Sequence, residues 1–538
     1  MASHILFLLL SAAVWSFGEA LPILSSLLTG ASNESDNIDS AYDEEQTISD
    51  LLQNANNDES DNIDNAYDDE QTISDLLQNA NNDVLNLYQM DMASNFGRGK
   101  RKCKTCIWKR STQGIVQVPY VLSDDYSSAN KDLIILAMLE FETMTCVQFI
   151  EKTSERSYLD IENGPGCWGY VGRKGWTQPL VLQKSYCMVY SIIQHELMHA
   201  IGFLHEHSRT DRDNYLHINW QYISPADEGN FVKDDEDSLG IPYDYSSVMH
   251  YGSTIYTNTS GKSTMEPTMD STVHLGQTVG LSSLDVKRIN VLYNCSQCRT
   301  KVLGASGTFS SEQATPVKDY DNCLWLLQIP KNLILLQFTE FHSSTNKCND
   351  KVNIYDGGSS NAALLATFYA DQPLPALVSS SSFLLLEYIT AAPGQSSFSG
   401  SYSSVTHGGT YTELSGSISS PKYPFDYPNE ASATYVIIAP PGYKISLTLL
   451  LVNLEPSPEC TKDSLEVRDG GDLTARSLGL FCGLEHSILT FNSRGPGLLL
   501  QFSSDGDTTR SGFVAHYQSI QEQRSPINIK VPLILPGI

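Results

Sequence analysis

The chain has 538 residues and a formal net charge of −28, so it is too long for one hydrophobic core and should divide into several domains. More than half of the acidic excess lies in residues 34–83, which carry sixteen Asp or Glu and no Lys or Arg. The remaining sequence is only mildly acidic, which argues against nucleic acid as a partner because phosphate binding needs clustered basic side chains.

Residues 1–20 are predicted to be a secretory signal. Residues 5–17 are almost entirely apolar, and small residues follow at Gly18 and Ala20, ahead of a cleavage point. The apolar run is too short to cross a bilayer comfortably, and no later stretch reaches about 18 uninterrupted apolar residues. We therefore expect a secreted, extracellular protein without a membrane span, whose eleven cysteines form disulfides on the oxidising export route.

Residues 21–101 are predicted to be an acidic propeptide that contains a tandem repeat. The 25 residues 34–58 recur as 59–83 with only two substitutions. This near-identity indicates a recent duplication rather than two shape-constrained units, and the segment has too few large apolar residues to fold alone. A solubilising arm and neutral filler are both compatible with this composition.

A basic cluster, Arg98-Gly99-Lys100-Arg101, follows the repeat. In an exported precursor it resembles a furin-type processing site, with cleavage after Arg101 or after Arg98 by a proprotein convertase or a trypsin-like protease. A solvated run of charge is the alternative interpretation.

The C-terminal part of the chain has the sequence texture of two β-sandwiches. Short apolar runs separated by Gly, Ser, Pro and Asp are typical of sandwich strands, and the tetrapeptide IYDG in the first half has a counterpart, VRDG, in the second. These runs lie at 323–329, 333–338, 384–388 and 498–502, and the tetrapeptides at 354–357 and 467–470. Residues 519–538 remain as a C-terminal tail.

The strongest functional signal is the stretch HELMHAIGFLHEHSRTDRD, which begins at His195. His195 and His199 are four residues apart, so on a helix they project from one face toward a single ion. Glu196 can take a proton from water beside them, and a glycine three residues after His199 allows a turn that brings His205 to the same ion. Three imidazoles leave an open position, as catalytic zinc requires. A lone helical histidine is usually structural, but the extended HExxHxxGxxH spacing favours one catalytic zinc.

This stretch resembles the zinc signature of the astacin family of metzincin metalloendopeptidases. The segment SVMHY at 247–251 resembles the Met-turn of that family, and the likeness continues over residues 103–295. The resemblance implies an α+β catalytic domain at 102–297.

The resemblance also implies roles for single residues. Glu196 would be the general base, Met249 would pack beneath the metal, and Tyr251 would be a swinging ligand that stabilises the tetrahedral intermediate. The N-terminus created by processing would pair with Glu206. Without the family, Met249 and Tyr251 would be read as ordinary core residues.

The propeptide segment Tyr88-Gln89-Met90-Asp91 resembles the F-x-G-D motif of the family. The resemblance implies that Asp91 occupies the open position of the zinc before activation, because a carboxylate can displace the water. Met90 stands where the family usually has Gly, so the sequence does not guarantee the same backbone path. An ordinary exposed aspartate is the alternative.

The two C-terminal units, 298–405 and 407–518, resemble CUB domains, which are all-β sandwiches. Spacing and family pattern together imply five disulfides and leave Cys348 unpaired, which we expect to be buried rather than intermolecular. Of three glycosylation sequons, the one at Asn258 is favoured. The implied disulfides are Cys103–Cys106, Cys146–Cys295, Cys167–Cys187, Cys298–Cys323 and Cys460–Cys482.

Some CUB domains bind calcium through one Glu and two Asp. The second unit has Glu455, Asp463 and Asp505 at the matching positions, and oxygen ligands spread over loops suit calcium. A calcium site is therefore predicted there, with a solvated acidic rim as the alternative. The first unit keeps Asp350 but has Ser343 at another of the positions, so no site is predicted in it.

Together these motifs predict a secreted zinc endopeptidase, made as a zymogen and followed by two CUB domains. The order of parts resembles vertebrate hatching enzymes, which implies egg-envelope glycoproteins as substrates and matrix proteins as CUB partners; that step is an analogy. An adhesion protein that works through its CUB units would be expected to have damaged catalytic positions, and here they are intact. An astacin-like protease with a matrix or digestive substrate stays open.

Overall fold

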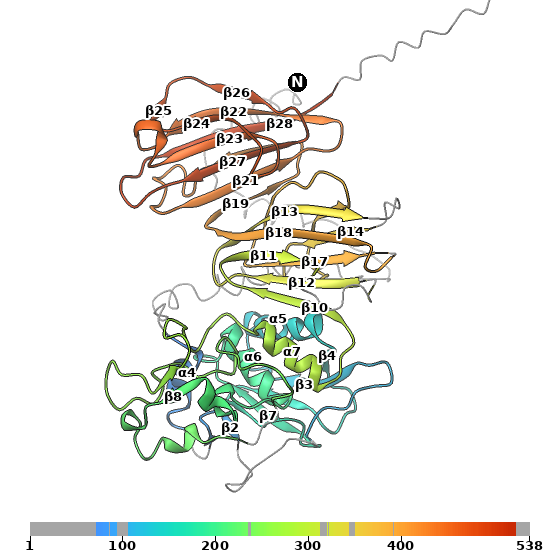
Figure 1. The fold of residues 1–538 in the computed structure, drawn as a ribbon, viewed down its shortest axis with the longest axis vertical. Helices are drawn as coiled ribbons and strands as arrows, with labels where there is room; N and C mark the ends of the chain where they lie inside the picture. Colours follow the sequence, from blue (N-terminus) through green and yellow to red (C-terminus); the bar gives the residue numbers. More distant parts are fainter. Residues whose placement is uncertain are drawn as a thin grey trace, which may run out of the picture. The chain divides into compact units, whose positions relative to one another are not determined.

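The computed structural model describes residues 71–84, 87–93, 106–234, 238–312, 320, 322–343, 350–390 and 392–522. Within these ranges a domain of helices and sheet precedes two β-sandwiches (Figure 1), which confirms the predicted fold class. The signal, the processing site, the first copy of the repeat, Cys103, Cys348 and the end of the tail lie outside the described residues.

The first domain is built on a sheet with the strand order β1-β2-β6-β7-β5-β3-β4. Neighbours among β3, β4, β5 and β7 pair in parallel, whereas β6 pairs antiparallel with β7. The strand β6 would be the edge of the sheet, but two short strands of the predicted propeptide, β1 and β2, extend it. The bounds are β1 Leu87–Tyr88, β2 Met92–Ala93, β3 Val116–Leu122, β4 Val147–Glu151, β5 Leu159–Glu162, β6 Cys167–Gly169 and β7 Gln178–Leu182.

In the described part of residues 102–297, the α-helices are α5 (Ser128–Met144), α6 (Tyr190–Ala200) and α7 (Ser283–Leu292). Side-chain caps at Ser127 and Ser282 begin α5 and α7, the latter as a capping box with Asp285. Helix α6 has no side-chain cap but is buried along its length after Tyr190. Because α6 is buried, its polar side chains need partners inside the protein.

The connection from α6 to α7 is mostly irregular. It contains four 3₁₀ turns and a two-stranded ribbon of β8 and β9. In order these are η1 Glu206–Ser208, η2 Arg212–Asn214, β8 Leu216–Ile218, η3 Trp220–Tyr222, η4 Glu228–Phe231 and β9 Met265–Pro267.

The second copy of the acidic repeat contributes a helix, α4 (Ile73–Asn81), that is folded against the peptidase domain. Its apolar residues belong to the same hydrophobic cluster as α5 and α6. The expectation that the repeat is not shape-constrained is therefore wrong for this copy. Too little apolar surface is present for folding alone, but a short amphipathic helix can bury that surface against a preformed domain.

One sheet has the same order of five strands in both sandwiches, β10-β12-β17-β14-β15 and β19-β21-β27-β23-β24. The other sheet is β11-β18-β13-β16 in the first sandwich and β20-β28-β22-β25 in the second, where β26 also pairs with β22. The predicted apolar runs fall in β12, β13, β17 and β27, and β28 continues three residues past the predicted end at 518. In the first sandwich the strands are β10 Cys298–Leu303, β11 Ser306–Ser310, β12 Asn322–Gln328, β13 Leu333–Ser343, β14 Lys351–Tyr355, β15 Leu364–Tyr369, β16 Leu377–Val378, β17 Phe383–Ile389 and β18 Ser396–Val405. In the second they are β19 His407–Tyr411, β20 Ser415–Ser419, β21 Ser432–Ile438, β22 Tyr443–Asn453, β23 Ser464–Asp469, β24 Arg476–Phe481, β25 Leu484–Glu485, β26 Leu489–Asn492, β27 Gly497–Ser503 and β28 Gly512–Gln521, with the turn η6 Pro458–Cys460.

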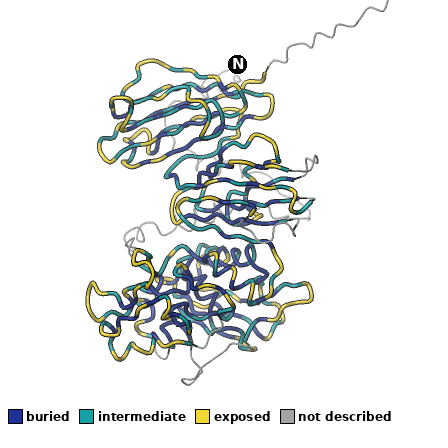
Figure 2. The backbone as a smooth tube through the Cα atoms, in the orientation of Figure 1, coloured by how far each residue is buried: buried dark blue, intermediate teal, exposed yellow. Residues whose placement is uncertain are grey.

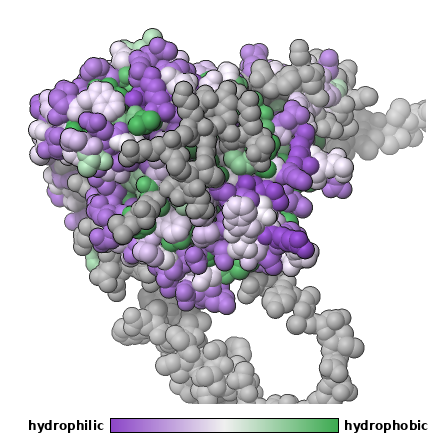
Figure 3. Space-filling model, turned by 90° about the horizontal axis from the view of Figure 1, so that it is seen from below, coloured by the Kyte–Doolittle hydropathy of each residue, from purple (hydrophilic) through white to green (hydrophobic). Residues whose placement is uncertain are grey.

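Burial follows the strands and the central helices, as the dark segments of Figure 2 show. On the face drawn in Figure 3, hydrophobic residues of the described chain are scattered among hydrophilic ones. Among the described residues, no helix has both the length and the apolar character needed to cross a membrane.

Four predicted disulfides are present in the structure. The fifth predicted pair, Cys103–Cys106, includes a cysteine outside the described residues. The four are Cys146–Cys295, Cys167–Cys187, Cys298–Cys323 and Cys460–Cys482.

Candidate metal centre

Helix α6 carries the first two predicted zinc ligands. His195 and His199 lie one turn apart, with ring centroids separated by 4.8 Å. The chain leaves the helix at Gly202, whose φ of +113° is a conformation that residues with side chains rarely adopt. The turn brings His205 beside both histidines, with ring centroids at 5.2 and 4.8 Å, as the spacing predicted.

Asp91 of the propeptide lies at the centre of the three histidines. Its carboxylate is 3.1 Å from Nε2 of His195, 3.3 Å from Nε2 of His199 and 3.2 Å from Nε2 of His205. All four residues are buried, and their ligand atoms lie within 4.8 Å of one another. The structure thus brings the three histidines and the predicted latency residue together.

The second nitrogen of each imidazole shows which atoms are left for a metal. Nδ1 of His195 bonds to the carbonyl oxygen of Val248 at 2.8 Å, and Nδ1 of His199 bonds to a carbonyl oxygen beyond the end of α6, also at 2.8 Å. Nδ1 of His205 lies 3.1 Å from Oε1 of Gln89. Because each Nδ1 faces an acceptor, it carries the proton, and each Nε2 presents a lone pair.

A bound cation would stabilise these closely spaced lone pairs. Nε2 of His195 and Nε2 of His205 are 3.3 Å apart, and two acceptors at that distance repel when no proton lies between them. Nε2 of His199 and one carboxylate oxygen of Asp91 have no hydrogen-bond partner among the described residues. Imidazole nitrogens and a carboxylate are ligands that Zn²⁺ prefers. The residues therefore fit a zinc ion, with Asp91 in the fourth position.

Glu196 is buried beside this cluster, and neither of its carboxylate oxygens has a hydrogen-bond partner among the described residues. Burial, and then the charge of Asp91, raise the pKa of Glu196 well above its usual range. Departure of Asp91 would remove that negative charge, lower the pKa of Glu196 and so favour its ionised carboxylate, which is the form that can accept a proton.

Tyr251 is held by the propeptide in this structure. Its hydroxyl donates to the carbonyl oxygen of Gln89 at 2.7 Å. Its ring stacks on His207 with centroids 3.8 Å apart and an interplanar angle of 24°. Gln89 therefore contacts both Tyr251 and His205, and its side-chain amide also donates to Asp234 at 3.0 Å.

The propeptide turn that makes these contacts is left-handed. Gln89 has a φ of +44° and Met90 a φ of +76°. Met90 thus adopts the backbone conformation that the glycine of the family motif would adopt freely. The side chain at this position does not prevent Asp91 from reaching the histidines.

The segment 247–251 is fixed to α7 through Asp285. The hydroxyl of Ser247 donates to Asp285 at 2.6 Å, and the N–H of Val248 donates to the other carboxylate oxygen at 2.8 Å. Since Val248 in turn accepts from His195, a chain of bonds joins α7 to the metal centre. Met249 is fully buried next to this point.

Glu206, next to the third histidine, is buried and satisfied within the domain. Arg288 forms a two-pronged ion pair with it, Arg209 donates to it at 3.1 Å, and the N–H of Asp244 donates at 2.8 Å. Burial raises the pKa of Glu206, and the charge of Arg288 opposes that rise. The residues around the predicted new N-terminus lie outside the described ranges, so its pairing with Glu206 stays a prediction.

Asp244 gives the peptidase a predicted pH-dependent stability. Burial, and then the charge of Asp285, raise the pKa of Asp244 from 3.8 to about 7. The folded state therefore holds a proton that the unfolded state releases between pH 4 and 7, so this contribution to stability is complete below about pH 4 and falls as pH rises toward 7. We expect Asp244→Asn to stabilise the protein at pH 8 by on the order of 4 kcal/mol and to have little effect at pH 4.

Thermal unfolding of both proteins across this pH range checks the Asp244 prediction. The expected result is a flatter dependence of Tm on pH for Asp244→Asn. Parallel curves for the two proteins would show that Asp244 titrates normally. Asp227→Asn, near the surface of the same domain, serves as the control.

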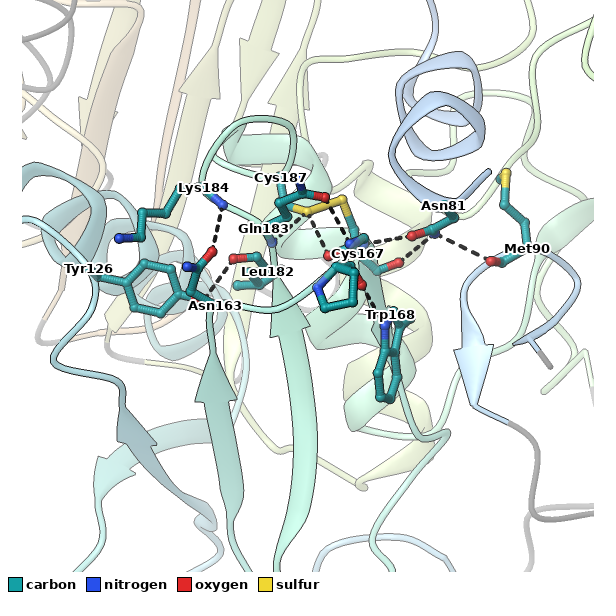
Figure 4. The surroundings of a disulfide bond; sticks show 12 residues. Asn81, Met90, Tyr126, Asn163, Cys167, Trp168, Leu182, Gln183, Lys184 and Cys187 are labelled. Carbon is teal, nitrogen blue, oxygen red and sulfur yellow. Dashed lines mark hydrogen bonds between the residues drawn. A yellow bond between two sulfur atoms is a disulfide. The ribbon is translucent and has the colours of Figure 1, made fainter. Parts of the chain in front are cut away.

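The propeptide also occupies the edge strand β6 (Figure 4). The side-chain amide of Asn81 accepts from the N–H of Cys167 at 2.7 Å and donates to its carbonyl oxygen at 2.7 Å. Two residues along the strand, the N–H of Gly169 donates to the carbonyl oxygen of Asp91 at 3.1 Å. The main-chain groups that a bound peptide could use on β6 are therefore taken at both positions.

The sequence did not single out Gln89, Asn81, Val248 or Asp285 as parts of this site. Gln89 and Asn81 act through contacts with residues more than eighty positions away. Val248 contributes a carbonyl group, which any residue carries. Asp285 has a sequence signal, the capping pattern with Ser282, but that pattern predicts only a helix start.

In the second sandwich the three predicted calcium ligands lie together. Carboxylate oxygens of Glu455, Asp463 and Asp505 lie within 4.8 Å of one another. One oxygen of Glu455 is buried without a hydrogen-bond partner among the described residues, while Lys462 contacts the other at 2.5 Å. This donor set fits a calcium ion.

In the first sandwich the corresponding aspartate is satisfied by hydroxyl groups. Ser343 donates to Asp350 at 2.7 Å, and Thr390 donates to its other oxygen at 2.7 Å. Both carboxylate oxygens of Asp350 therefore accept hydrogen bonds from neutral hydroxyl groups.

Three histidines with free lone pairs lie beside Glu196, which shares helix α6 with His195 and His199 and has no hydrogen-bond partner among the described residues. A zinc-dependent peptidase needs this combination to activate water. Residues 102–294 match the family described as Astacin (Peptidase family M12A), and residues 298–402 and 407–517 match the CUB domain. The chain belongs to the astacin family: it is a zinc metalloendopeptidase with two CUB domains.

Known relatives agree with this assignment. Astacin-like metalloendopeptidase of Gallus gallus is 45% identical over 309 residues, covering 56% of this chain and 76% of that protein. Embryonic protein UVS.2 of Xenopus laevis is 34% identical over 442 residues, covering 81% and 85%. High choriolytic enzyme 1 of Oryzias latipes is 42% identical over 211 residues, covering 39% and 78%. Its solved structure, described as a hatching enzyme zinc-protease, covers 37% of this chain and 100% of that chain with a TM-score of 0.36.

Proposed function

We propose that this chain is a secreted zymogen whose processed form hydrolyses peptide bonds in egg-envelope proteins. The observation that carries the catalytic part is the convergence of three Nε2 lone pairs beside the unpaired carboxylate of Glu196. The substrate is supported by the similarity to High choriolytic enzyme 1. Processing after Arg98 or Arg101 releases the propeptide, and the new N-terminus then pairs with Glu206.

In the proposed mechanism, His195, His199 and His205 hold a zinc ion, which when bound acidifies water and polarises the scissile carbonyl. Glu196 takes the proton from the attacking water and delivers it to the leaving amine. Tyr251, once released from Gln89, donates its hydroxyl to the developing oxyanion.

Cleavage assays on isolated egg envelopes and on casein test the substrate. Envelope cleavage by the processed chain supports the hatching role. Cleavage of casein but not of egg envelopes would support the protease activity, reject the hatching role and favour a matrix or digestive substrate. If the processed, zinc-loaded chain cleaves neither, the result would favour a binding protein that acts through its CUB domains and their matrix partners.

The exposed Asn258 is the proposed glycan site.

Latency depends on Asp91 in this proposal. In a chain made uncleavable by Arg98→Gln and Arg101→Gln, we expect Asp91→Ala to raise peptidase activity at least tenfold, because a charge-assisted contact of about 1.5–3 kcal/mol is lost. Hydrolysis of a fluorogenic peptide measures the change. Asp83→Ala, at an exposed propeptide residue, is the matched control, and equal activity of the two variants would reject the role of Asp91.

The second CUB domain is proposed to bind calcium. We expect calorimetry on the full chain to show one calcium site, and Asp463→Asn to lower its affinity at least tenfold, because a negative ligand is replaced by a neutral one. Asp350→Asn changes the corresponding residue of the first CUB domain and should leave calcium binding unchanged. Equal calcium binding by the wild type and Asp463→Asn would show that these carboxylates form only an acidic rim.

A further inference from the structure

The propeptide helix α4 buries one face in the peptidase domain. Ile73 is 2% exposed and Leu77 is 0% exposed, and with Leu76 and Ala80 they join the hydrophobic cluster that includes α5 and α6. Thr72 begins the helix with a capping box to Asp75. The helix is therefore seated in an apolar site and starts at a defined residue.

Polar contacts fix both ends of α4. At its start, the N–H of Gly252, the residue after Tyr251, donates to Oγ of Ser74 at 2.8 Å. Thr72 packs so closely there that a Cβ on Gly252 would lie 2.5 Å from its hydroxyl oxygen. At its end, Asn81 pairs with both main-chain groups of Cys167 on β6 (Figure 4). One helix thus connects the segment after the Met-turn to the edge strand.

The first copy of the repeat contains the same ligand. Residues 46–58 and 71–83 are identical, and both read QTISDLLQNANND. Every α4 side chain that contacts the peptidase therefore has an identical counterpart 25 positions earlier. The counterparts of Thr72, Ile73, Ser74, Leu76, Leu77, Ala80 and Asn81 are Thr47, Ile48, Ser49, Leu51, Leu52, Ala55 and Asn56.

We propose that the α4 site is a peptide-binding site that accepts either copy of the repeat, so that the propeptide carries a spare inhibitory helix. This inference rests on the proposed latency of the zymogen. The ligand is an amphipathic segment with a hydroxyl side chain in its first turn, two adjacent leucines and a terminal asparagine. The 13-residue segments 46–58 and 71–83 are identical, and they are joined to the strand β1 by chains of different length.

Loop length sets the preference between the copies. Five residues, 82–86, join Asn81 to β1, whereas thirty residues, 57–86, would join Asn56 to it. Closing the longer loop is disfavoured on the order of tenfold, because the closure probability falls as roughly the 3/2 power of loop length. The second copy is therefore the usual occupant, and the first copy takes the site when the second is damaged.

Matched substitutions in the two copies test this inference. The background is an uncleavable chain with Arg98→Gln, Arg101→Gln and Asp91→Ala, in which the carboxylate contact is lost while α4, Gln89 and β2 still hold the segment in place. Leu77→Asp should raise peptidase activity about tenfold, and Leu52→Asp alone should change it less than twofold. Leu52→Asp together with Leu77→Asp should raise activity at least threefold beyond Leu77→Asp alone.

Three results of these activity measurements would contradict the inference or the proposed latency on which it rests. If the double variant is no more active than Leu77→Asp, the first copy does not use the site. If Asp91→Ala alone already reaches the activity of the processed enzyme, α4 does not inhibit and the inference fails. An uncleavable chain with intact Asp91 that is fully active would instead overturn the proposed latency.

A peptide experiment checks the site without changing the protein. The synthetic peptide QTISDLLQNANND should inhibit the processed wild-type enzyme, whereas the same peptide with aspartate at its second leucine should inhibit at least tenfold less. Equal inhibition by both peptides, or none by either, would reject the site. Cleavable versions of the Leu52 and Leu77 variants control for folding, because processing removes both positions and should yield wild-type activity.

Discussion

Replacing Glu196 by alanine is expected to lower kcat/KM of the processed protease by about 10²- to 10⁴-fold while zinc stays bound. Glu196 is buried beside the three histidines, and both carboxylate oxygens lack partners among the described residues. A residue that only supported the fold would pair such a group, since a buried unpaired carboxylate is unfavourable. General base catalysis contributes roughly 10²–10⁴-fold in enzymes, which sets the size of the expected loss.

Casein hydrolysis and zinc content measured on the same sample check the Glu196 prediction. The three histidines are unchanged in Glu196→Ala, so one zinc per chain should remain. Glu228→Ala replaces an exposed glutamate of the same domain and should keep full activity. Loss of zinc together with activity would mean that Glu196 acts by supporting the metal site rather than by moving a proton.

Replacing Arg288 by methionine should destabilise the peptidase domain by about 3–5 kcal/mol, because it leaves Glu206 as a buried charge without its main partner. The side chain of Glu206 is fully buried and that of Arg288 is 5% exposed. For a domain of this size the loss corresponds to a fall in Tm of roughly 10 °C. Arg209 remains near Glu206, so the lower end of the range is expected.

The double variant Glu206→Gln with Arg288→Met separates charge from packing. Removing both charges together should recover most of the lost stability, because no unpaired buried charge remains. Thermal unfolding of the single and double variants measures the recovery. Arg494→Met, at an exposed residue of the second CUB domain, is the control; a double variant as unstable as Arg288→Met would assign the loss to packing.

The sequence predicted the parts of the site that are local in the chain. The three histidines and Glu196 lie within eleven residues, where helical spacing and one glycine determine their geometry. Asp91 and Tyr251 came from family resemblance, and the structure places Asp91 against the histidines and Tyr251 against Gln89. The sandwich strands were visible because their apolar runs alternate with turn residues.

The interactions around the site could not be read from the sequence. Gln89, Asn81 and Asp285 contribute through pairings fixed by tertiary structure, and their residue types have no distinctive spacing. Helix α4 was missed for a related reason: its four apolar residues are too few to predict independent folding, and only the peptidase surface explains their burial. Composition indicates whether a segment can fold alone, but it does not indicate whether the segment folds when it packs against another domain.

The left-handed turn at Gln89 and Met90 lowers the affinity with which the predicted propeptide binds the peptidase domain. Each of these residues occupies a conformation that costs about 1–2 kcal/mol for an L-residue with a side chain. While the propeptide is covalently attached, its high local concentration compensates for that cost. The proposed cut after Arg98 or Arg101 would remove this advantage, so we expect the inhibition by this segment to be strong within one molecule and weak between two molecules.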